Sequence, residues 1–159
     1  MSQPFPSPTQ LSPSRLAYLG DAVWELLVRE KLVEENTPNP STEALRFVTA
    51  RAQAKASGTI LPLLTEEEES VWRRGRNMGH SNIPKSATLA EYCAATGLEC
   101  LFGWLYLMDR RERLRELFSL SFSPEAISSD RKEEDTGAPS VPPPPPFDGE
   151  DEGRIVTKP

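Results

Sequence analysis

The most apolar stretch of the chain, residues 89–108, constrains the fold more than any other feature. Its longest uncharged run, from Cys100 to Met108, has nine residues. A membrane-spanning helix needs about 20. Thr88 and Glu91 stand at the start of the stretch, in the capping-box pattern that begins a helix. We therefore predict a helix that belongs to a folded core rather than a membrane span.

One carboxylate, Glu99, lies inside this apolar stretch. Burying an unpaired carboxylate costs several kcal/mol, so the group must be paired, protonated or bound to a cation. Two interpretations follow from this helix alone. Glu99 forms a salt bridge where two helices cross, or it is a ligand for a hard metal ion.

The rest of the chain up to residue 122 also has helical periodicity, and no segment alternates as a strand does. Capping residues mark several helix starts, with Ser12 before Pro13 and Thr65 paired with Glu68. Helices are predicted over residues 13–35, 42–57, about 66–77, 89–108 and 110–121. In the last of these, Leu114, Leu117 and Phe118 should point inward. The predicted fold class is all-α.

The chain divides into three predicted parts: a flexible arm over residues 1–11, a helical domain over 12–122, and a disordered proline-rich acidic tail over 123–159. Residues 124–159 hold nine acids, four bases and eight prolines, a composition that cannot bury enough apolar surface to fold. The run Pro142–Pro146 favours a polyproline II helix, and a docking site for a proline-recognising partner is the functional alternative for it.

Composition excludes several classes of protein. Two cysteines, Cys93 and Cys100, cannot form a disulfide framework or a four-ligand zinc site. The N-terminus lacks the basic and apolar regions of a secretory signal, so we expect a cytoplasmic protein with no membrane partner. The net charge of −6 lies mostly in the tail, because residues 1–123 hold fifteen acids and fourteen bases. A nucleic-acid partner is therefore not excluded, because the electrostatic potential at a binding surface depends on the charges near that surface and not on the net charge of the chain.

A second carboxylate stands beside a glycine in the first predicted helix. Gly20 is unfavourable inside a helix and indicates a close backbone approach, and Gly97 and Gly103 are similar positions in the apolar helix. If the two helices cross there, Asp21 and Glu99 converge in one pocket. Two such carboxylates would repel each other, and a divalent cation such as magnesium would remove the conflict. Glu25, one turn after Asp21, is more simply a partner of Arg29.

A loop rich in arginine and glycine supplies the candidate nucleic-acid-binding residues. They are cations and a polar side chain around the end of the third predicted helix: Arg73, Arg74, Arg76, Asn77 and Lys85. Phosphate and sugar contacts suit this composition, and a solvated helix end is the alternative. A second group of cations is predicted to point largely outward from the last helix: Arg110, Arg111, Arg113 and Arg115. His80, the single histidine, is interpreted as a loop residue without a catalytic role.

Three motifs in order resemble the ribonuclease III catalytic domain. They are LAYLGDAVWE at residues 16–25, RRGRN at 73–77 and AATGLECLFGWLYL at 94–107. The resemblance covers residues 11–122 and is strongest to the small bacterial branch of the family called Mini-ribonuclease III, which lacks the double-stranded-RNA-binding domain. Ala17 and Thr96 stand where full-length ribonuclease III has two further acids.

The resemblance implies an all-α homodimer that cleaves double-stranded RNA with magnesium, or manganese in its place. It assigns the metal and the catalysis to Asp21 and Glu99. It also implies a 23S ribosomal RNA precursor as substrate, and a ribosomal protein as a candidate helper. Because Ala17 and Thr96 are not acids, more of the metal shell must come from water or RNA phosphate.

The sequence predicts a cytoplasmic endoribonuclease with duplex RNA held mainly through its backbone. The first alternative is a catalytically weak RNA-binding or ribosome-assembly factor with the same fold, which is favoured if two carboxylates fail to hold a metal. The second is a scaffold that acts through Pro142–Pro146.

Overall fold

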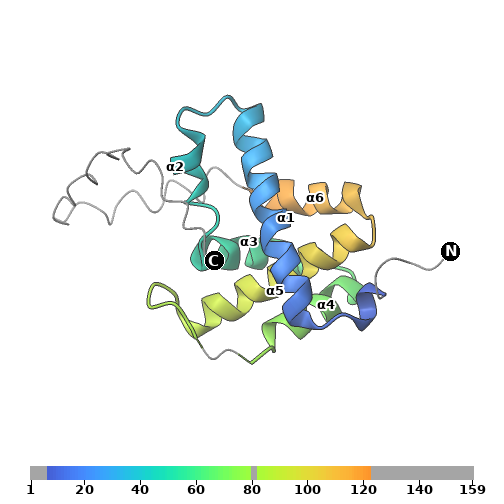
Figure 1. Cartoon of the computed structure of the whole chain (residues 1–159). Coiled ribbons are helices and arrows are strands. Elements are labelled where there is room, and N and C mark those ends of the chain that lie inside the picture. The colour runs from blue at the N-terminus through green and yellow to red at the C-terminus, as the bar shows by residue number, and fades with distance from the viewer. Residues whose placement is uncertain (1–6, 80–81, 123–159) are drawn as a thin grey trace, which may run out of the picture.

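A computed structural model describes residues 7–79 and 82–122 of the chain (Figure 1). Within these residues every regular element is a helix, so the predicted all-α class is confirmed. The six α-helices are α1 Pro13–Glu34, α2 Pro40–Ala44, α3 Ala50–Ile60, α4 Glu66–Arg76, α5 Leu89–Leu107 and α6 Arg111–Ser121. Two short 3-10 helices, η1 Pro8–Gln10 and η2 Leu61–Leu63, precede α1 and follow α3. The predicted tail, residues 123–159, and His80 lie outside the described residues.

Helix α5 is the centre of the fold, and α1, α3 and α4 all pack against it. Ten of its residues are buried, with Leu98, Leu101 and Phe102 fully inaccessible to solvent. Burial on several sides at once accounts for the sequence of this helix, which is apolar nearly all round. Each of the other α-helices buries at least one residue in the shared core, and α1 contributes Leu16, Val23 and Trp24 among others. In Figure 1, α1 crosses the middle of α5.

The predicted helix starts are confirmed by hydrogen bonds. Thr65 accepts from the backbone N–H of Glu68, and the Glu68 side chain accepts from the backbone N–H of Thr65. Thr88 and Glu91 make the same reciprocal pair at the start of α5. Ser12 accepts from the N–H of Arg15 at the start of α1. Each cap satisfies backbone donors that would otherwise lack a partner.

The single helix predicted over residues 42–57 is wrong, because the chain forms α2 and α3 instead. Between them, the carbonyl of Phe47 accepts a 2.9 Å hydrogen bond from Nε1 of the buried Trp24. Thr49 then caps α3 by accepting from the N–H of Ala52. The helix also continues through Gly58 to Ile60, so this glycine does not end it.

The second half of the predicted N-terminal arm is folded. Residues 8–10 form η1, and the carbonyl of Leu11 accepts a 2.9 Å hydrogen bond from Nη2 of Arg74. Leu11 also packs against the hydrophobic core. This contact fixes the chain before α1 to helix α4, and the two residues that make it are too far apart in sequence for composition to pair them.

Within residues 7–79 and 82–122, no helix combines the length and the apolar character that a bilayer crossing demands. The three tryptophans, Trp24, Trp72 and Trp104, are buried in the core. Trp24 makes edge-on contacts with Phe102 of α5 and Phe118 of α6.

Glycines set the distance between α1 and α5. A Cβ atom on Gly20 would overlap the carbonyl oxygen of Glu99, and one on Gly103 would overlap the carbonyl oxygen of Leu16. Both contacts are with backbone, which cannot move aside as a flexible side chain could. The predicted crossing is therefore confirmed at Gly20 and Gly103, and it brings Asp21 next to Glu99. The prediction is wrong for Gly97, which faces the ring of Trp72 on α4 instead of α1.

This contact predicts opposite effects for two Gly→Ala changes. Gly103→Ala should destabilise the protein by about 2–3 kcal/mol, because overpacking forces the helices apart. Gly58→Ala, in α3, should stabilise it by about 0.5–1 kcal/mol, because alanine is the better helix former and nothing lies within 4 Å of the new Cβ. Urea unfolding of both variants measures the difference. Equal effects would show that α1 and α5 are not in backbone contact.

Candidate active site at the crossing of α1 and α5

The candidate site is built by the helix crossing itself. Gly20 lets α1 approach the backbone of Glu99, and Asp21 is the next residue along the helix. The carboxyl groups of Asp21 and Glu99 come close enough to share a proton in a hydrogen bond. The glutamate is half-buried in α5, and the aspartate is exposed to solvent on α1. The structure therefore brings together the two acids that the sequence predicts to converge.

The electrostatics of the pair disfavour two negative charges. The pKa of Glu99 is raised to about 8, chiefly by burial and then by the neighbouring charge of Asp21, while the Gln53 amide acts to lower it. The pKa of Asp21 is also raised, first by partial burial and then by the charge of Glu25. Two adjacent carboxylates cannot easily ionise together unless a cation compensates them.

No cation in the described part of the chain forms an ion pair with either acid. Glu25, the next acid on α1, is paired with Arg29 at 2.6 Å, as predicted. These findings do not support the interpretation of Glu99 as a salt-bridge partner at a helix crossing.

The donor chemistry of the pair suits a hard divalent cation, because carboxylate oxygens are the ligands that magnesium takes from proteins. Within the described residues, no cluster of three or more His, Cys, Asp or Glu side chains is placed to hold a metal. This part of the chain thus offers two carboxylates at most, and the remaining ligands must be waters or phosphate oxygens. The exposure of Asp21 leaves one side of the pair open to such ligands.

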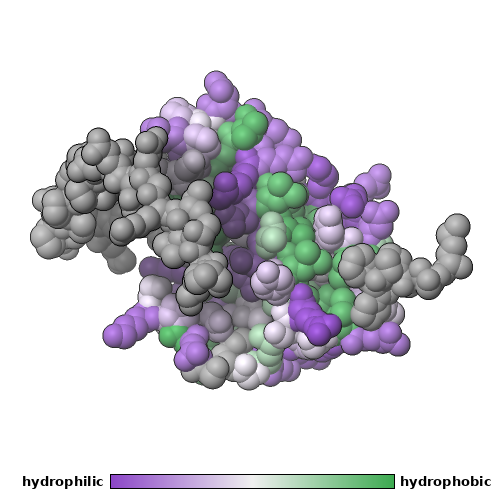
Figure 2. Space-filling view, in the orientation of Figure 1, coloured by the Kyte–Doolittle hydropathy of each residue, from purple (hydrophilic) through white to green (hydrophobic). Residues whose placement is uncertain are grey.

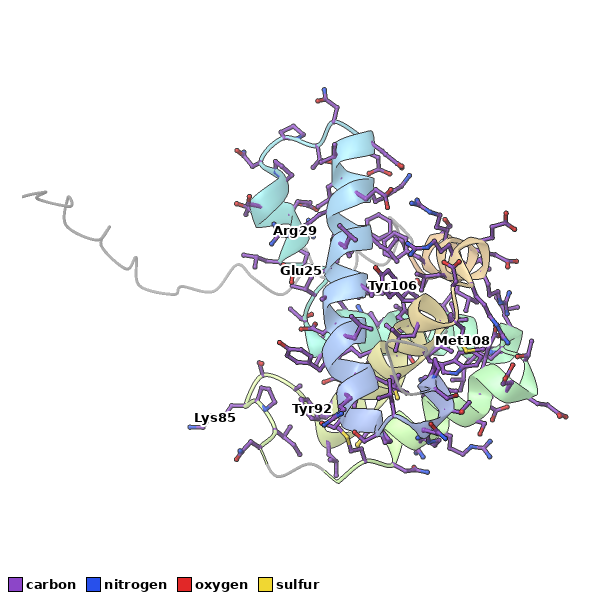
Figure 3. The ribbon with its side chains drawn as sticks, turned by 45° about the vertical axis from the view of Figure 1, so that its right-hand side comes forward. Glu25, Arg29, Lys85, Tyr92, Tyr106 and Met108 are labelled. Carbon is purple, nitrogen blue, oxygen red and sulfur yellow. The ribbon has the colours of Figure 1, made fainter. Side chains whose placement is uncertain are left out.

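The candidate RNA-binding residues occupy the end of α4 and the loop after it. Arg73 is exposed but forms an ion pair with Glu69, and Arg74 is half-buried and donates to Leu11. Arg76 is exposed, lies 5.9 Å from the ring centre of Trp72 and donates only weakly to Asn77. Lys85 projects away from the helices, on the side of α1 from which Glu25 and Arg29 also project (Figure 3). Arg76, Asn77 and Lys85 are therefore the members of the set that are most accessible to a ligand.

The predicted outward orientation of the second arginine group is wrong for Arg113. This residue makes two hydrogen bonds of 2.9 Å to Glu68 and one of 2.8 Å to the carbonyl of Leu63. Glu68 is only 2% exposed, and its pKa is lowered, chiefly by the hydrogen bond from Arg113. The arginine is needed to neutralise a buried acid, so it is a structural residue.

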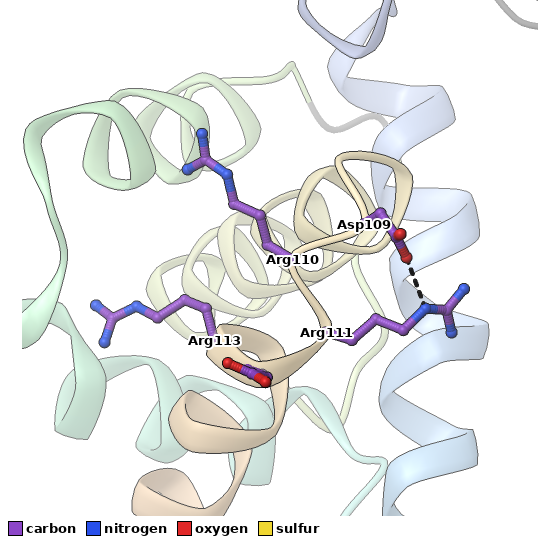
Figure 4. Close-up of a pocket in the computed structure, with 5 residues that line it drawn as sticks. Asp109, Arg110, Arg111 and Arg113 are labelled. Atoms are coloured by element: carbon purple, nitrogen blue, oxygen red, sulfur yellow. Dashed lines mark hydrogen bonds and ion pairs between the residues drawn. The ribbon is translucent and has the colours of Figure 1, made fainter.

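Of the other arginines in this group, Arg111 and Arg115 are exposed and Arg110 is half-buried, and all three are paired. Arg115 contacts Glu30 at 3.0 Å, and Arg110 contacts Glu67 at 3.0 Å. Arg110, Arg111 and Arg113 border an open surface pocket (Figure 4), in which Arg111 donates to Asp109. The rings of Trp104 and Tyr106 lie against Arg110 and Arg111. These contacts restrict the group's capacity to bind a further anion.

One residue near the acid pair was not predicted. Gln53 of α3 is 2% exposed, and its amide faces Glu99 closely enough to affect the pKa of that carboxyl. The buried residues of α3 are Gln53, Ala56, Ser57 and Ile60. Their spacing places them on one face of the helix. A glutamine on a face whose other members are small or apolar is the sequence feature that could have pointed to Gln53.

Comparisons with known proteins identify the relatives of this fold. Residues 14–110 match the family model described as Ribonuclease III domain. The chain is 48% identical to the Mini-ribonuclease 3 of Symbiobacterium thermophilum, over 70% of this chain and 88% of that one. It is 44% identical to the Mini-ribonuclease 3 of Thermoanaerobacter sp., over 70% and 80%. The crystal structure of protein FN1578 from Fusobacterium nucleatum superposes with a TM-score of 0.64 at 29% identity, covering 76% of this chain and 95% of that one.

Proposed function

The chain belongs to the ribonuclease III family and is an endoribonuclease that acts on double-stranded RNA, and we propose that its activity depends on a magnesium ion held by Asp21 and Glu99. The strongest support is the contact of these two acids where α1 crosses α5, with neither in any ion pair among the described residues. Manganese, which accepts the same oxygen ligands, is the proposed substitute.

The two acids have different tasks in this proposal. Glu99 is fixed by the central helix and supplies one of the two carboxylate ligands. Asp21 stands at the solvent edge and completes the pair beside the phosphate that is cleaved. When bound there, a divalent ion activates water and stabilises the leaving oxygen of the phosphodiester. Because the described residues supply two carboxylates, an RNA phosphate would supply a further ligand to the ion, and substrate binding would then be coupled to the chemistry.

RNA is held by the cations at the end of α4 and in the loop before α5. We assign this contact to the predicted set Arg73, Arg74, Arg76, Asn77 and Lys85. Arg76, Asn77 and Lys85 are the exposed members of the set that are not engaged in an ion pair with another described residue. Backbone contacts of this kind carry little base specificity, since duplex RNA is recognised mainly by its shape.

A homodimer is proposed on the basis of an apolar stripe along α1. Tyr18, Leu26 and Val33 are 86%, 60% and 72% exposed, and their spacing places them with Ala22 on one side of the helix. Figure 2 shows apolar side chains gathered along α1. The stripe lies next to Asp21 in sequence, so a second copy packed against it would bring two acid pairs into one assembly.

The cellular role is proposed from the small branch of the family. The relatives in this branch carry the name Mini-ribonuclease 3, and we assign this chain to the maturation of 23S ribosomal RNA ends in the cytoplasm. A ribosomal protein bound to the precursor is the proposed helper. The catalytic unit is residues 12–122, with the arm and the tail as additions to it.

A cleavage assay tests the proposal directly. A duplex with the sequence of a 23S precursor stem should be cut in MgCl₂ or MnCl₂ and should stay intact in EDTA. The same strand without its complement should resist cleavage. Equal turnover in EDTA would remove the role given to Asp21 and Glu99, and equal cleavage of unrelated duplexes would remove the ribosomal precursor as the preferred substrate.

Removal of one exposed cation tests the mode of RNA binding. Arg76→Ala should weaken binding uniformly across unrelated duplexes and lower the salt dependence of binding by a slope of about one, since one phosphate contact is lost. Binding is measured over a salt series in an Asp21→Asn background, to prevent cleavage. Arg115→Ala is the matched control, because this exposed arginine is already paired with Glu30 and should change the slope less. An unchanged slope for Arg76→Ala would place this residue outside the interface.

A further inference from the structure

Two buried polar side chains on α3 differ in one respect. Gln53 and Ser57 are 2% and 1% exposed, and both lie on the face of α3 that is buried. Ser57 accepts a 2.7 Å hydrogen bond from Nε1 of Trp72, so its burial is compensated. Nε2 of Gln53 is buried and has no hydrogen-bond partner among the described residues. A buried donor without a hydrogen-bond partner costs about 1–3 kcal/mol of stability. The burial of the Gln53 amide is therefore uncompensated and needs an explanation, whereas the burial of Ser57 does not.

The group beside this amide is the Glu99 carboxylate. Helix α3 packs against α5, and the Gln53 amide is one of the groups that act on Glu99, together with burial and Asp21. Burial and Asp21 both disfavour the charged carboxylate, whereas the amide favours it. Gln53 is therefore a buried, uncharged donor next to an acid that forms no ion pair with any described residue.

The chemistry of a carboxylate makes this arrangement useful. A carboxylate has two oxygens, and a donor on one of them fixes the plane of the group and leaves the other free. In metal sites, such outer partners orient the ligand, and their removal typically costs about 10- to 100-fold in metal affinity or activity. A glutamine is suited to the role because it adds no charge to a pair that already repels itself.

We propose that Gln53 is a positioning residue that donates from Nε2 to Glu99 and turns its carboxylate toward Asp21, so that both acids face one divalent cation. This assignment rests on the proposed role of the acid pair. Gln53 itself does not touch the RNA or the cation. A donor at this position would hold the plane of the Glu99 carboxylate, and Nε2 of Gln53 is available for it because it has no other hydrogen-bond partner among the described residues.

The test uses Gln53→Met, which keeps the length and shape of the side chain and removes the donor. In metal-free buffer the melting temperature should stay equal or rise, because the unpartnered buried amide is removed. The increase in melting temperature caused by MnCl₂ alone should shrink. With duplex RNA, kcat should fall about 10- to 100-fold while KM for RNA stays within about threefold, since no RNA contact is lost.

Ser57→Ala is the matched control on the same helix. It removes a satisfied hydrogen bond, so it should lower the melting temperature in metal-free buffer and leave both the MnCl₂ response and kcat near those of the wild type. Gln53→Ala is a second variant in case methionine does not fit. It should lower the melting temperature through the cavity it leaves, yet show the same reduced MnCl₂ response as Gln53→Met.

Two outcomes would overturn the assignment. A Gln53→Met protein with a lower metal-free melting temperature, a normal MnCl₂ response and a normal kcat would make Gln53 a structural residue like Ser57. Asp21→Asn, measured in parallel, separates this result from a failure of the proposed site. If Asp21→Asn abolishes cleavage and the MnCl₂ response while Gln53→Met alters neither, only the role of Gln53 is wrong. If Asp21→Asn also behaves as the wild type, the metal site itself is wrong and the role of Gln53 falls with it.

Discussion

Asp21→Asn is expected to reduce cleavage of duplex RNA by several orders of magnitude while leaving the fold intact. The change keeps the size and shape of the side chain and deletes the charge that is proposed to hold the cation. Loss of a metal-centred step removes both the activated water and the stabilisation of the leaving oxygen. Asp21 is exposed, and its carboxylate is in no ion pair among the described residues. Its replacement therefore breaks no ion pair that stabilises the folded state.

Turnover of a labelled duplex in MgCl₂ measures the effect, with helical circular dichroism and thermal melting as checks on folding. Glu25→Gln is the matched control, since it makes the same kind of change one turn further along α1. Glu25 is paired with the exposed Arg29, and a surface pair of this kind contributes at most about 1 kcal/mol to stability. The Glu25→Gln protein should therefore stay folded, and its turnover should stay within a few-fold of the wild type. Turnover of Asp21→Asn within about threefold of the wild type would remove Asp21 from the metal site.

The predictions from sequence succeeded where residues close together in the chain determine the structure, or where a residue is unfavourable unless another helix packs against it. The capping pairs Thr65–Glu68 and Thr88–Glu91 begin helices in the structure, because a cap depends only on residues three apart. The crossing of α1 and α5 was predictable because a glycine inside a helix lowers its stability unless a neighbouring backbone needs the space. Gly20 and Gly103 do meet the opposite backbones.

The predictions failed where a partner distant in sequence decides the structure. Arg113 has the appearance of a surface cation in its own helix, and only the position of Glu68 on α4 reveals the ion pair. The division of residues 42–57 depends on Trp24, whose indole N–H binds the carbonyl of Phe47. Gln53 was missed for the same reason, since its importance comes from α5 and not from its neighbours in α3.

Glu99→Gln is expected to abolish cleavage and at the same time to stabilise the protein in metal-free buffer above neutral pH. Activity is lost because an amide oxygen is a weaker ligand and one of the two charges that attract the cation is gone. Stability rises because the half-buried carboxylate next to Asp21 is unfavourable when no cation is present. A residue that served only as a salt-bridge partner would behave in the opposite way, losing stability and sparing turnover.

The stabilisation by Glu99→Gln is also expected to depend on pH. The pKa of Glu99 in the folded protein is raised to about 8 by burial and by Asp21, from an ordinary value of 4.5. Between these two values the folded state binds the proton more tightly than the unfolded state does, so the wild-type free energy of unfolding should fall as the pH rises. The stabilisation by Glu99→Gln should therefore be negligible near pH 4.5, grow up to about pH 8 and level off above it.

Urea unfolding of both proteins at several pH values, with and without MgCl₂, measures this difference. Magnesium should favour the ionised carboxylate and stabilise the wild type most at high pH, while the variant should respond little. A difference that is the same at every pH would show that Glu99 does not titrate in this range. A wild type that gains no stability from magnesium at pH 8 would argue that the acid pair binds the ion only together with RNA, whose phosphate would then be an obligatory part of the site.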